Sequence, residues 1–207
     1  MVEFLNELCS GMFSDELDKM GYRNQVIVGM KLNNGGKIYG EAKTVKIETV
    51  ETDDENIREG LGFLGTLGEG DVLCVEGSQM FAYFGELMTR LSTRQGINGV
   101  VIGGLTRDSH YTKDASLSIF AQNYSPKDIK GRGRVSFTNV PITIDSKPIH
   151  PGDYIFGDSD GVVIIPKNVR EELENRIKNV LTNERNIIND IRSGKTVDYI
   201  LEHYKEF

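Results

Sequence analysis

The chain has 207 residues, which is enough for one domain with a sizeable core. Its 24 basic and 31 acidic residues give a formal net charge of −7, which argues against a general binder of phosphate backbones. No apolar run approaches the roughly 18 residues that a membrane helix needs, and the N-terminus lacks a basic, apolar leader. We therefore expect a soluble, cytoplasmic protein without a membrane segment and without direct contact to nucleic acid.

The amino-terminal part of the chain predicts a helix followed by a hairpin. Apolar residues at helical spacing predict a helix within the first twenty residues, with Ser14 offering an N-cap. Residues 25–32 and 37–50 read as two strands that flank the turn 33–36, whose Asn-Asn-Gly-Gly sequence is a strong hairpin signal. The acidic stretch 52–56 predicts a surface loop, and a short helix is expected after it.

The middle of the chain predicts a strand–helix–strand unit. Residues 71–75 form a buried-strand pattern, and a helix is expected from about Tyr83 to Arg94. Residues 100–102 form a second buried strand, which we expect to break at the glycines of 103–104. Two buried strands that flank a helix predict a parallel pair, and hence an α/β fold.

The carboxyl-terminal part predicts short strands and then helices. The strands are expected at 117–121, 135–140, 142–144, 154–156 and 162–165. From Asn168 an apolar stripe at helical spacing predicts a long helix that ends at Ser193-Gly194, and 196–204 predicts a final short helix. We expect an α/β domain over 1–167 and a helical extension over 168–207 that packs on the domain or on a neighbouring subunit.

A loop-to-helix junction at Gly85-Glu86-Leu87-Met88 is the first candidate site. The first N–H groups of a helix lack internal partners, so the amides of Leu87 and Met88 could cradle a carboxylate. Gly85 would let a ligand approach the backbone closely. The alternative is an ordinary helix on which Glu86 and Arg90 pair at i, i+4.

Arg107 and Asp108 are the second candidate, because they follow a buried strand and two glycines. Ligands of parallel sheets bind beyond the carboxyl ends of the strands. Arg107 could hold a substrate carboxylate through two parallel hydrogen bonds, and Asp108 could ligate a magnesium ion. The alternative is a loop salt bridge between the two side chains.

Other motifs give weaker signals. His110 could shuttle a proton or could be an exposed loop histidine. The basic stretch 130–134 predicts a solvated turn, and 158–161 predicts a tight hairpin turn because the closing glutamate of a calcium loop is missing. Cys9 and Cys74 are expected to be reduced core thiols, since no pairing or CxxC spacing is present.

The spacing Glu86-x20-Arg107-Asp108 resembles the acid-x20-Arg-Asp signature of the RraA-like family. That family includes metal-dependent 4-hydroxy-4-methyl-2-oxoglutarate aldolases and regulators of ribonuclease E activity. The similarity spans roughly Ser14 to Pro166. It includes the segments Ser14-Asp15-Glu16-Leu17-Asp18, Gly40-Glu41-Ala42-x-Thr44-Val45, Gly70-Asp71-Val72-Leu73, Gly99-Val100-Val101, Gly131-Arg132-Gly133, Asn139-Val140-Pro141-Ile142, Pro151-Gly152-Asp153-Tyr154 and Asp158-x-Asp160-Gly161-Val162-Val163-Ile164-Ile165-Pro166.

The resemblance implies a swivelling β/β/α sandwich that assembles as a homotrimer or homohexamer with active sites between subunits. It implies that Asp108 ligates a divalent ion directly and that Glu86 acts through water on that ion. It also implies that Arg107 holds the substrate and that the Leu87 and Met88 amides bind its carboxylate. Two positions depart from the aldolase pattern: Tyr111 stands where those members tend to carry a second acid, and Glu86 replaces the commoner aspartate.

These observations predict a lyase that acts on a small 2-keto acid with Mg²⁺ or Mn²⁺. No lysine is obviously placed to form a Schiff base, so we expect the ion to stabilise the enolate of a retro-aldol cleavage or an oxaloacetate-type decarboxylation. The alternative is a non-catalytic protein that binds and regulates the RNA-degradation machinery, which an acidic chain could do by contacting a basic partner. A sugar-acid or nucleotide-sugar enzyme with the same metal pocket is a third option.

Overall fold

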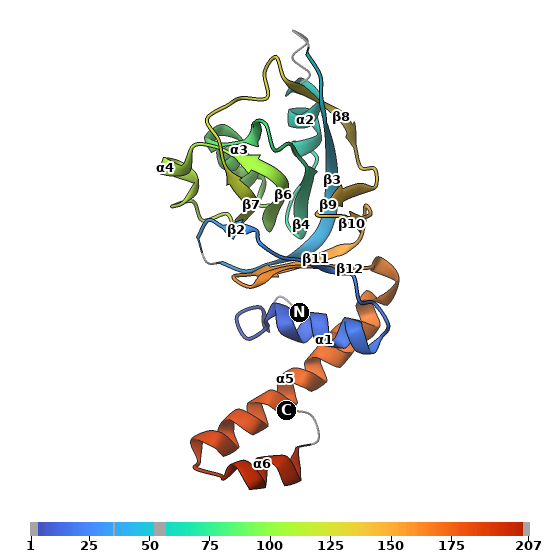
Figure 1. Cartoon of the computed structure of the whole chain (residues 1–207), viewed down its shortest axis with the longest axis vertical. Helices are drawn as coiled ribbons and strands as arrows, with labels where there is room; N and C mark the ends of the chain where they lie inside the picture. The colour runs from blue at the N-terminus through green and yellow to red at the C-terminus, as the bar shows by residue number, and fades with distance from the viewer. Residues whose placement is uncertain (1–3, 35, 52–56, 205–207) are drawn as a thin grey trace.

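The computed structural model describes residues 4–34, 36–51 and 57–204 (Figure 1). The acidic loop expected at 52–56 lies outside this range. The helices are α1 Ser10–Lys19, α2 Ile57–Leu64, α3 Glu86–Gln95, α4 Ser109–Thr112, the 3-10 turn η2 Lys167–Val169, α5 Arg170–Arg192 and α6 Val197–His203. The strands are β1 Val26–Ile27, β2 Lys31–Leu32, β3 Ile38–Thr49, β4 Asp71–Glu76, β5 Ala82–Phe84, β6 Gly99–Thr106, β7 Ile119–Tyr124, β8 Gly133–Thr138, β9 Ile142–Ile144, β10 Lys147–Ile149, β11 Tyr154–Asp158 and β12 Gly161–Ile165.

A mixed sheet carries the core, and its centre is parallel. In the described residues the strand order is β1-β12-β11-β3-β4-β6-β7-β2, with β5 added to β6 and β8 added to β3. Strands β3, β4, β6 and β7 pair in parallel, which confirms the predicted strand–helix–strand unit. The α/β class is therefore as expected. Beta-branched and apolar side chains fill β4 and β6, which are buried along nearly their whole length.

Strand β6 does not break at its two glycines, contrary to the prediction. It continues to Thr106, and its pairing with β7 shifts register between Ile102 and Leu105. A Cβ on Gly104 would lie 2.6 Å from the backbone nitrogen of Ser78, so the residue admits a close approach of two chain segments. The glycines thus let β6 stay paired with β7 as far as Thr106, the residue before Arg107.

The predicted hairpin around 33–36 is wrong. Strand β1 pairs with β12 and β2 pairs with β7, whereas β3 lies between β11 and β4. The side chain of Asn33 explains the separation, because its Nδ2 donates to the carbonyl of Leu117 (3.0 Å) and its Oδ1 accepts from the amide of Ile119 (2.7 Å). The asparagine therefore anchors the segment to the start of β7 and does not close a two-strand turn.

The amino-terminal helix begins at Ser10, so Ser14 is not its N-cap as predicted. Asp158, at the β11–β12 turn, accepts hydrogen bonds from the backbone nitrogen and the hydroxyl of Ser10, both at 2.8 Å. A distant carboxylate thus performs the task that a local N-cap usually performs. The tight turn expected at 158–161 is confirmed by the pairing of Asp158 with Gly161.

The carboxyl-terminal helices extend away from the sheet (Figure 1). The first half of α5 buries Leu173 and Ile177 against α1 and the outer face of β11 and β12, where Phe13 and Phe156 stack with ring centroids 4.4 Å apart. The helix ends before Ser193-Gly194, as predicted, and α6 follows. The division into 1–167 and 168–207 stays a prediction. Within the described residues, none of the helices is long and apolar enough to span a membrane.

Candidate functional site

The two sequence candidates meet at the ends of β5 and β6. The helix that was expected from Tyr83 begins at Glu86, because residues 82–84 form β5 and pair with β6. The carbonyl of Phe84 accepts from the backbone nitrogen of Arg107 (2.9 Å) and from the Thr106 hydroxyl (2.8 Å). These bonds place the start of α3 directly beside Arg107 and Asp108.

Asp108 binds the amino-terminal end of α3. The backbone nitrogen of Glu86 donates to Asp108 Oδ2 at 2.9 Å, which places a carboxylate where the helix dipole favours negative charge. Asp108 itself has φ 58° and ψ 47°, a left-handed conformation that aspartate tolerates better than most residues. None of the hydrogen bonds formed among the described residues reaches its Oδ1, so that oxygen can accept a further ligand.

Gly85 is needed for this contact. A Cβ at position 85 would lie 2.4 Å from Asp108 Oδ2 and 2.7 Å from Arg107 Cγ, both far inside normal contact distance. The side chains of Asp108 and Arg107 therefore lie against the Gly85 backbone, and the close approach of a ligand stays a prediction. The first-turn amides of Leu87 and Met88 follow on the same helix end, where helical geometry leaves N–H groups without internal partners.

Arg107 pairs with two carboxylates. Its Nε lies 3.6 Å from Asp108 Oδ2, and its Nη1 lies 3.1 Å from Asp128 Oδ2. The salt bridge offered as the alternative reading of Arg107-Asp108 is thus present. Asp128 was not predicted from the sequence, since no motif spacing marks it. It reaches the site because it forms an isolated parallel bridge with Ala82 of β5.

The carboxylate of Glu86 points to a different set of partners. Arg90 donates to Glu86 Oε1 through Nη2 (2.8 Å) and Nε (2.9 Å), so the predicted i, i+4 alternative is present as well. His110 Nε2 lies 3.6 Å from Glu86 Oε2, and the Arg90 guanidinium stacks over Tyr111 at 4.1 Å from the ring centre. Tyr111 therefore supports the arginine that holds Glu86.

The residues fit one kind of divalent ion and not another. The described part of the chain contains no cluster of three or more His, Cys, Asp or Glu side chains that could hold a metal. A closed zinc site needs such a cluster. Magnesium and manganese differ, because they keep several waters and take one or two protein carboxylates plus substrate oxygens. Asp108, with Oδ1 open, could supply that one carboxylate, and the metal stays a prediction.

The remaining sequence candidates lie outside this site or at its edge. The stretch 130–134 is a turn only in part, since Gly133 and Arg134 belong to β8 and Arg134 bonds Glu48 at 3.2 Å. Both cysteines are free thiols; Cys74 is fully buried and Cys9 is half-buried. His110 is exposed on α4 and contacts only the edge of the site through Glu86.

The chain is similar to several known proteins in sequence and in fold. The family model described as "RraA-like: Aldolase/RraA" matches residues 11–164. A protein of Halalkalibacterium halodurans named "Putative 4-hydroxy-4-methyl-2-oxoglutarate aldolase" is 31% identical over 170 residues, which cover 80% of this chain and 76% of that protein. Protein DlpA of Legionella pneumophila is 26% identical over 197 residues, and the chain spans 32% of its length. The crystal structure of an uncharacterized protein from Pseudomonas syringae pv. tomato superimposes with a TM-score of 0.84 at 27% identity, over 99% of this chain and 95% of that one.

Proposed function

The chain belongs to the RraA-like family, and on that premise we propose that it is a divalent-metal-dependent lyase that cleaves a carbon–carbon bond of a small 2-keto acid. Its relatives and its fold support an aldolase-type lyase or an RraA regulator. One observation favours the lyase: Asp108 lies at the amino-terminal end of α3, 2.9 Å from the Glu86 amide, with Arg107 beside it. A surface that only bound protein would not need an open carboxylate oxygen next to a guanidinium and a helix end.

Arg107 and the α3 amides would orient the substrate. A 2-keto acid carries a carboxylate, which the fork of a guanidinium and the free amides of Leu87 and Met88 both recognise. Arg107 already pairs with Asp128, so its guanidinium is held in place before a substrate arrives. Preorganised orientation of this kind contributes several kcal/mol to a reaction when the geometry is good.

Asp108 would hold the metal, and Glu86 would move the proton. A Mg²⁺ or Mn²⁺ ion at this position would supply Lewis acidity that polarises the keto carbonyl. Glu86 would hold a water molecule and pass a proton to or from the substrate as the carbon–carbon bond breaks. Arg90 fixes the rotamer of Glu86, and His110, at 3.6 Å, faces the other carboxylate oxygen and offers a second proton carrier.

Asp108→Asn tests the proposal. Asparagine tolerates the left-handed backbone and keeps the shape of the side chain, so the fold should survive while the charge is lost. We expect magnesium-dependent release of pyruvate from oxaloacetate, and cleavage of 4-hydroxy-4-methyl-2-oxoglutarate, to fall by at least about 100-fold, the order of effect expected for a group that stabilises charge in the transition state. Asp114→Asn, the same change at an exposed carboxylate six positions away, is the control.

Activity that persists in EDTA, or an Asp108→Asn variant with normal turnover, would overturn the metal-dependent mechanism. A wild-type chain that turns over no 2-keto acid with either metal, and that retains a ribonuclease or helicase in pull-down, would establish the regulator instead. Both results can be read from the same purified protein.

A further inference from the structure

A pocket of about 700 Å³ opens at the carboxyl-terminal ends of β6 and β7. Ligands of parallel sheets bind at this edge, and the candidate site lies on it as well. Leu105 lines the pocket two residues, or about 7 Å of extended chain, before Arg107. Lys127 lines it too, and the next residue, Asp128, pairs with Arg107 at 3.1 Å. The pocket therefore adjoins the guanidinium that would hold the substrate carboxylate.

Main-chain hydrogen bonds fix the walls of the pocket. The backbone nitrogen of Leu105 donates to the carbonyl of Ser78 (3.0 Å), which ties the loop before β5 to β6. On the other side, the backbone nitrogen of Ser125 donates to the carbonyl of Thr106 (2.9 Å), which ties the end of β7 to the same strand. The position of the pocket relative to Arg107 is thus set by the sheet.

The polar groups of the pocket are mostly amides and hydroxyls, and none of the described residues that line it is acidic. They belong to Gln79, Gln122, Asn123, Tyr124 and Ser125. Gln79 Nε2 donates to Gln122 Oε1, which leaves Gln79 Oε1 and Gln122 Nε2 for a ligand. An amide both donates and accepts, as a hydroxyl group does, whereas an anion only accepts. The pocket therefore suits a hydroxylated chain.

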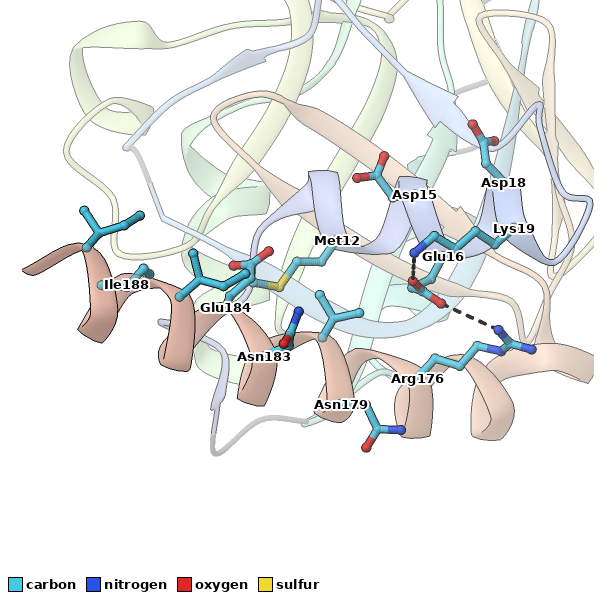
Figure 2. A pocket seen from close by; sticks show the side chains of 13 residues that line it. Met12, Asp15, Glu16, Asp18, Lys19, Arg176, Asn179, Asn183, Glu184 and Ile188 are labelled. Atoms are coloured by element: carbon cyan, nitrogen blue, oxygen red, sulfur yellow. Dashed lines mark hydrogen bonds and ion pairs between the residues drawn. The ribbon is translucent and has the colours of Figure 1, made fainter. Parts of the chain in front are cut away.

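The charge of the pocket also favours a ligand rich in oxygen. Across residues 4–34, 36–51 and 57–204, the Lys127 ammonium has no carboxylate partner. A second ammonium, that of Lys31, donates to Asn123 Oδ1 at 2.9 Å. This setting is unusual in a chain of net charge −7. The larger groove between α1 and α5 is its opposite, because that groove is lined by the carboxylates of Asp15, Glu16, Asp18 and Glu184 (Figure 2).

We propose that the pocket receives the hydroxylated tail of the substrate, so that the 2-keto acid cleaved at the candidate site is a sugar acid of six carbons. This inference rests on the proposed lyase function. Arg107 would hold the carboxylate at carbon 1, while Gln79, Gln122 and Lys127 would bond the hydroxyls on the last two carbons. A four-carbon acid held by Arg107 is too short to enter the pocket.

The cleavage balances without any further reactant. The bond between carbons 3 and 4 breaks, and its electron pair passes to carbon 3 to give the enolate of pyruvate, which then takes up a proton. The hydroxyl on carbon 4 loses its proton and becomes the aldehyde oxygen of the second product. A six-carbon acid with hydroxyls on carbons 4 to 6, 2-keto-3-deoxygluconate, thus gives pyruvate and glyceraldehyde in equal amounts.

Two acids that share the cleaved bond test the proposal. The first is 2-keto-3-deoxygluconate, and the second is 4-hydroxy-2-ketobutyrate, which lacks the tail and gives pyruvate and formaldehyde. Pyruvate release with Mg²⁺, followed by reduction to lactate with lactate dehydrogenase and NADH, yields kcat/KM for each acid. We expect the wild-type protein to prefer the six-carbon acid by at least about tenfold, as for a tail that makes several hydrogen bonds.

Variants of the pocket should reduce that preference. Lys127→Met and Gln122→Leu keep the size of each side chain and remove its hydrogen bonds, so each should lower the ratio of the two kcat/KM values by about 3- to 10-fold. Lys178→Met, the same change at an exposed lysine of α5, is the control and should leave both rates unchanged. Melting temperatures of all three variants should match the wild type, because none of these side chains is buried.

The ratio separates this inference from the proposed function. Cleavage of the four-carbon acid without a preference for the six-carbon acid would overturn the tail pocket and leave the lyase standing. Release of pyruvate from neither acid, with Mg²⁺ or Mn²⁺, would count against the lyase and remove the tail pocket with it. A Lys127→Met variant that slows both acids equally would also overturn the assignment, since the lysine would then act on the fold or on the reacting end.

Discussion

Gly85→Ala is a one-atom test of how the candidate site is organised. The new Cβ would lie 2.4 Å from Asp108 Oδ2, so that oxygen must retreat by about 1 Å to reach an ordinary contact distance of 3.4 Å. That movement breaks the 2.9 Å hydrogen bond from the Glu86 amide. A hydrogen bond to a charged group contributes about 1.5–3 kcal/mol, and each 1.36 kcal/mol corresponds to a factor of ten. For the proposed lyase activity, we therefore expect kcat/KM for oxaloacetate to fall by about 10- to 150-fold.

The fold should tolerate the same change. Gly85 has φ −156°, an extended conformation that alanine adopts freely, and Asp108 is 34% exposed, so water can solvate the displaced carboxylate. Loss of chain entropy in the unfolded state stabilises a Gly→Ala variant by about 0.4–1 kcal/mol, which offsets part of the lost bond. Gly62→Ala in α2, where nothing lies within 4 Å of the new Cβ, is the matched control. Unchanged kcat/KM in Gly85→Ala, or a large drop in its melting temperature, would refute this account of the site.

Three further predictions concern stability. Asp158→Ala should lower the free energy of unfolding by about 2–4 kcal/mol in urea titration, because it leaves the buried donors of Ser10 unpaired; Ser10→Ala should cost less. Leu173→Ala should lower the free energy of unfolding by about 2–5 kcal/mol, because Leu173 is buried. Leu201→Ala should change it by under about 0.5 kcal/mol, because Leu201 is exposed. Burial raises the pKa of the Cys74 thiol above its ordinary 9.0, so the folded state holds that proton more tightly and stability should fall as pH rises above about 9. Melting temperatures measured from about pH 8 to 10 should fall less steeply in Cys74→Ala than in the wild-type protein. An equally steep fall in both proteins would show that Cys74 does not cause the loss of stability.

Local patterns predicted the central elements well. The strands at β4 and β6 are short apolar runs rich in β-branched residues and flanked by glycines, and these features together favour strands over a buried helix. The end of α5 at Ser193-Gly194 was equally clear, because glycine at a positive φ ends helices.

Pairing partners could not be predicted in the same way. The Asn-Asn-Gly-Gly sequence has the composition of a hairpin turn, but Asn33 bonds the start of β7, more than eighty residues along the chain. Likewise the cap of α1 is Asp158, which no local window around Ser10 contains. Long-range hydrogen bonds overrode local propensity in both cases.

In the candidate site, too, local sequence predicted some features, and long-range contacts determine others. Spacing along the chain identified Glu86, Arg107 and Asp108, and the structure brings their backbones together at one edge of the sheet. It also offered the Glu86–Arg90 pair as the alternative for this helix, and that pair is present, but it did not identify Asp128, whose place depends on its bridge to β5. Spacing along the chain and along a helix therefore pointed to residues that the structure brings together, whereas a partner that depends on strand pairing, Asp128, left no signal in the sequence.

The position of β3 in the sheet has a consequence for synthesis on the ribosome. Its first half pairs with β11, where Glu41 lies opposite Tyr154, a partner 113 positions later in the chain. The N–H and C=O groups on that side of β3 therefore have no strand partner until most of the remaining polypeptide has been translated. A nascent chain halted before Tyr154 carries an open, apolar strand edge, and it is this unfinished intermediate that a ribosome-associated chaperone would have to shield.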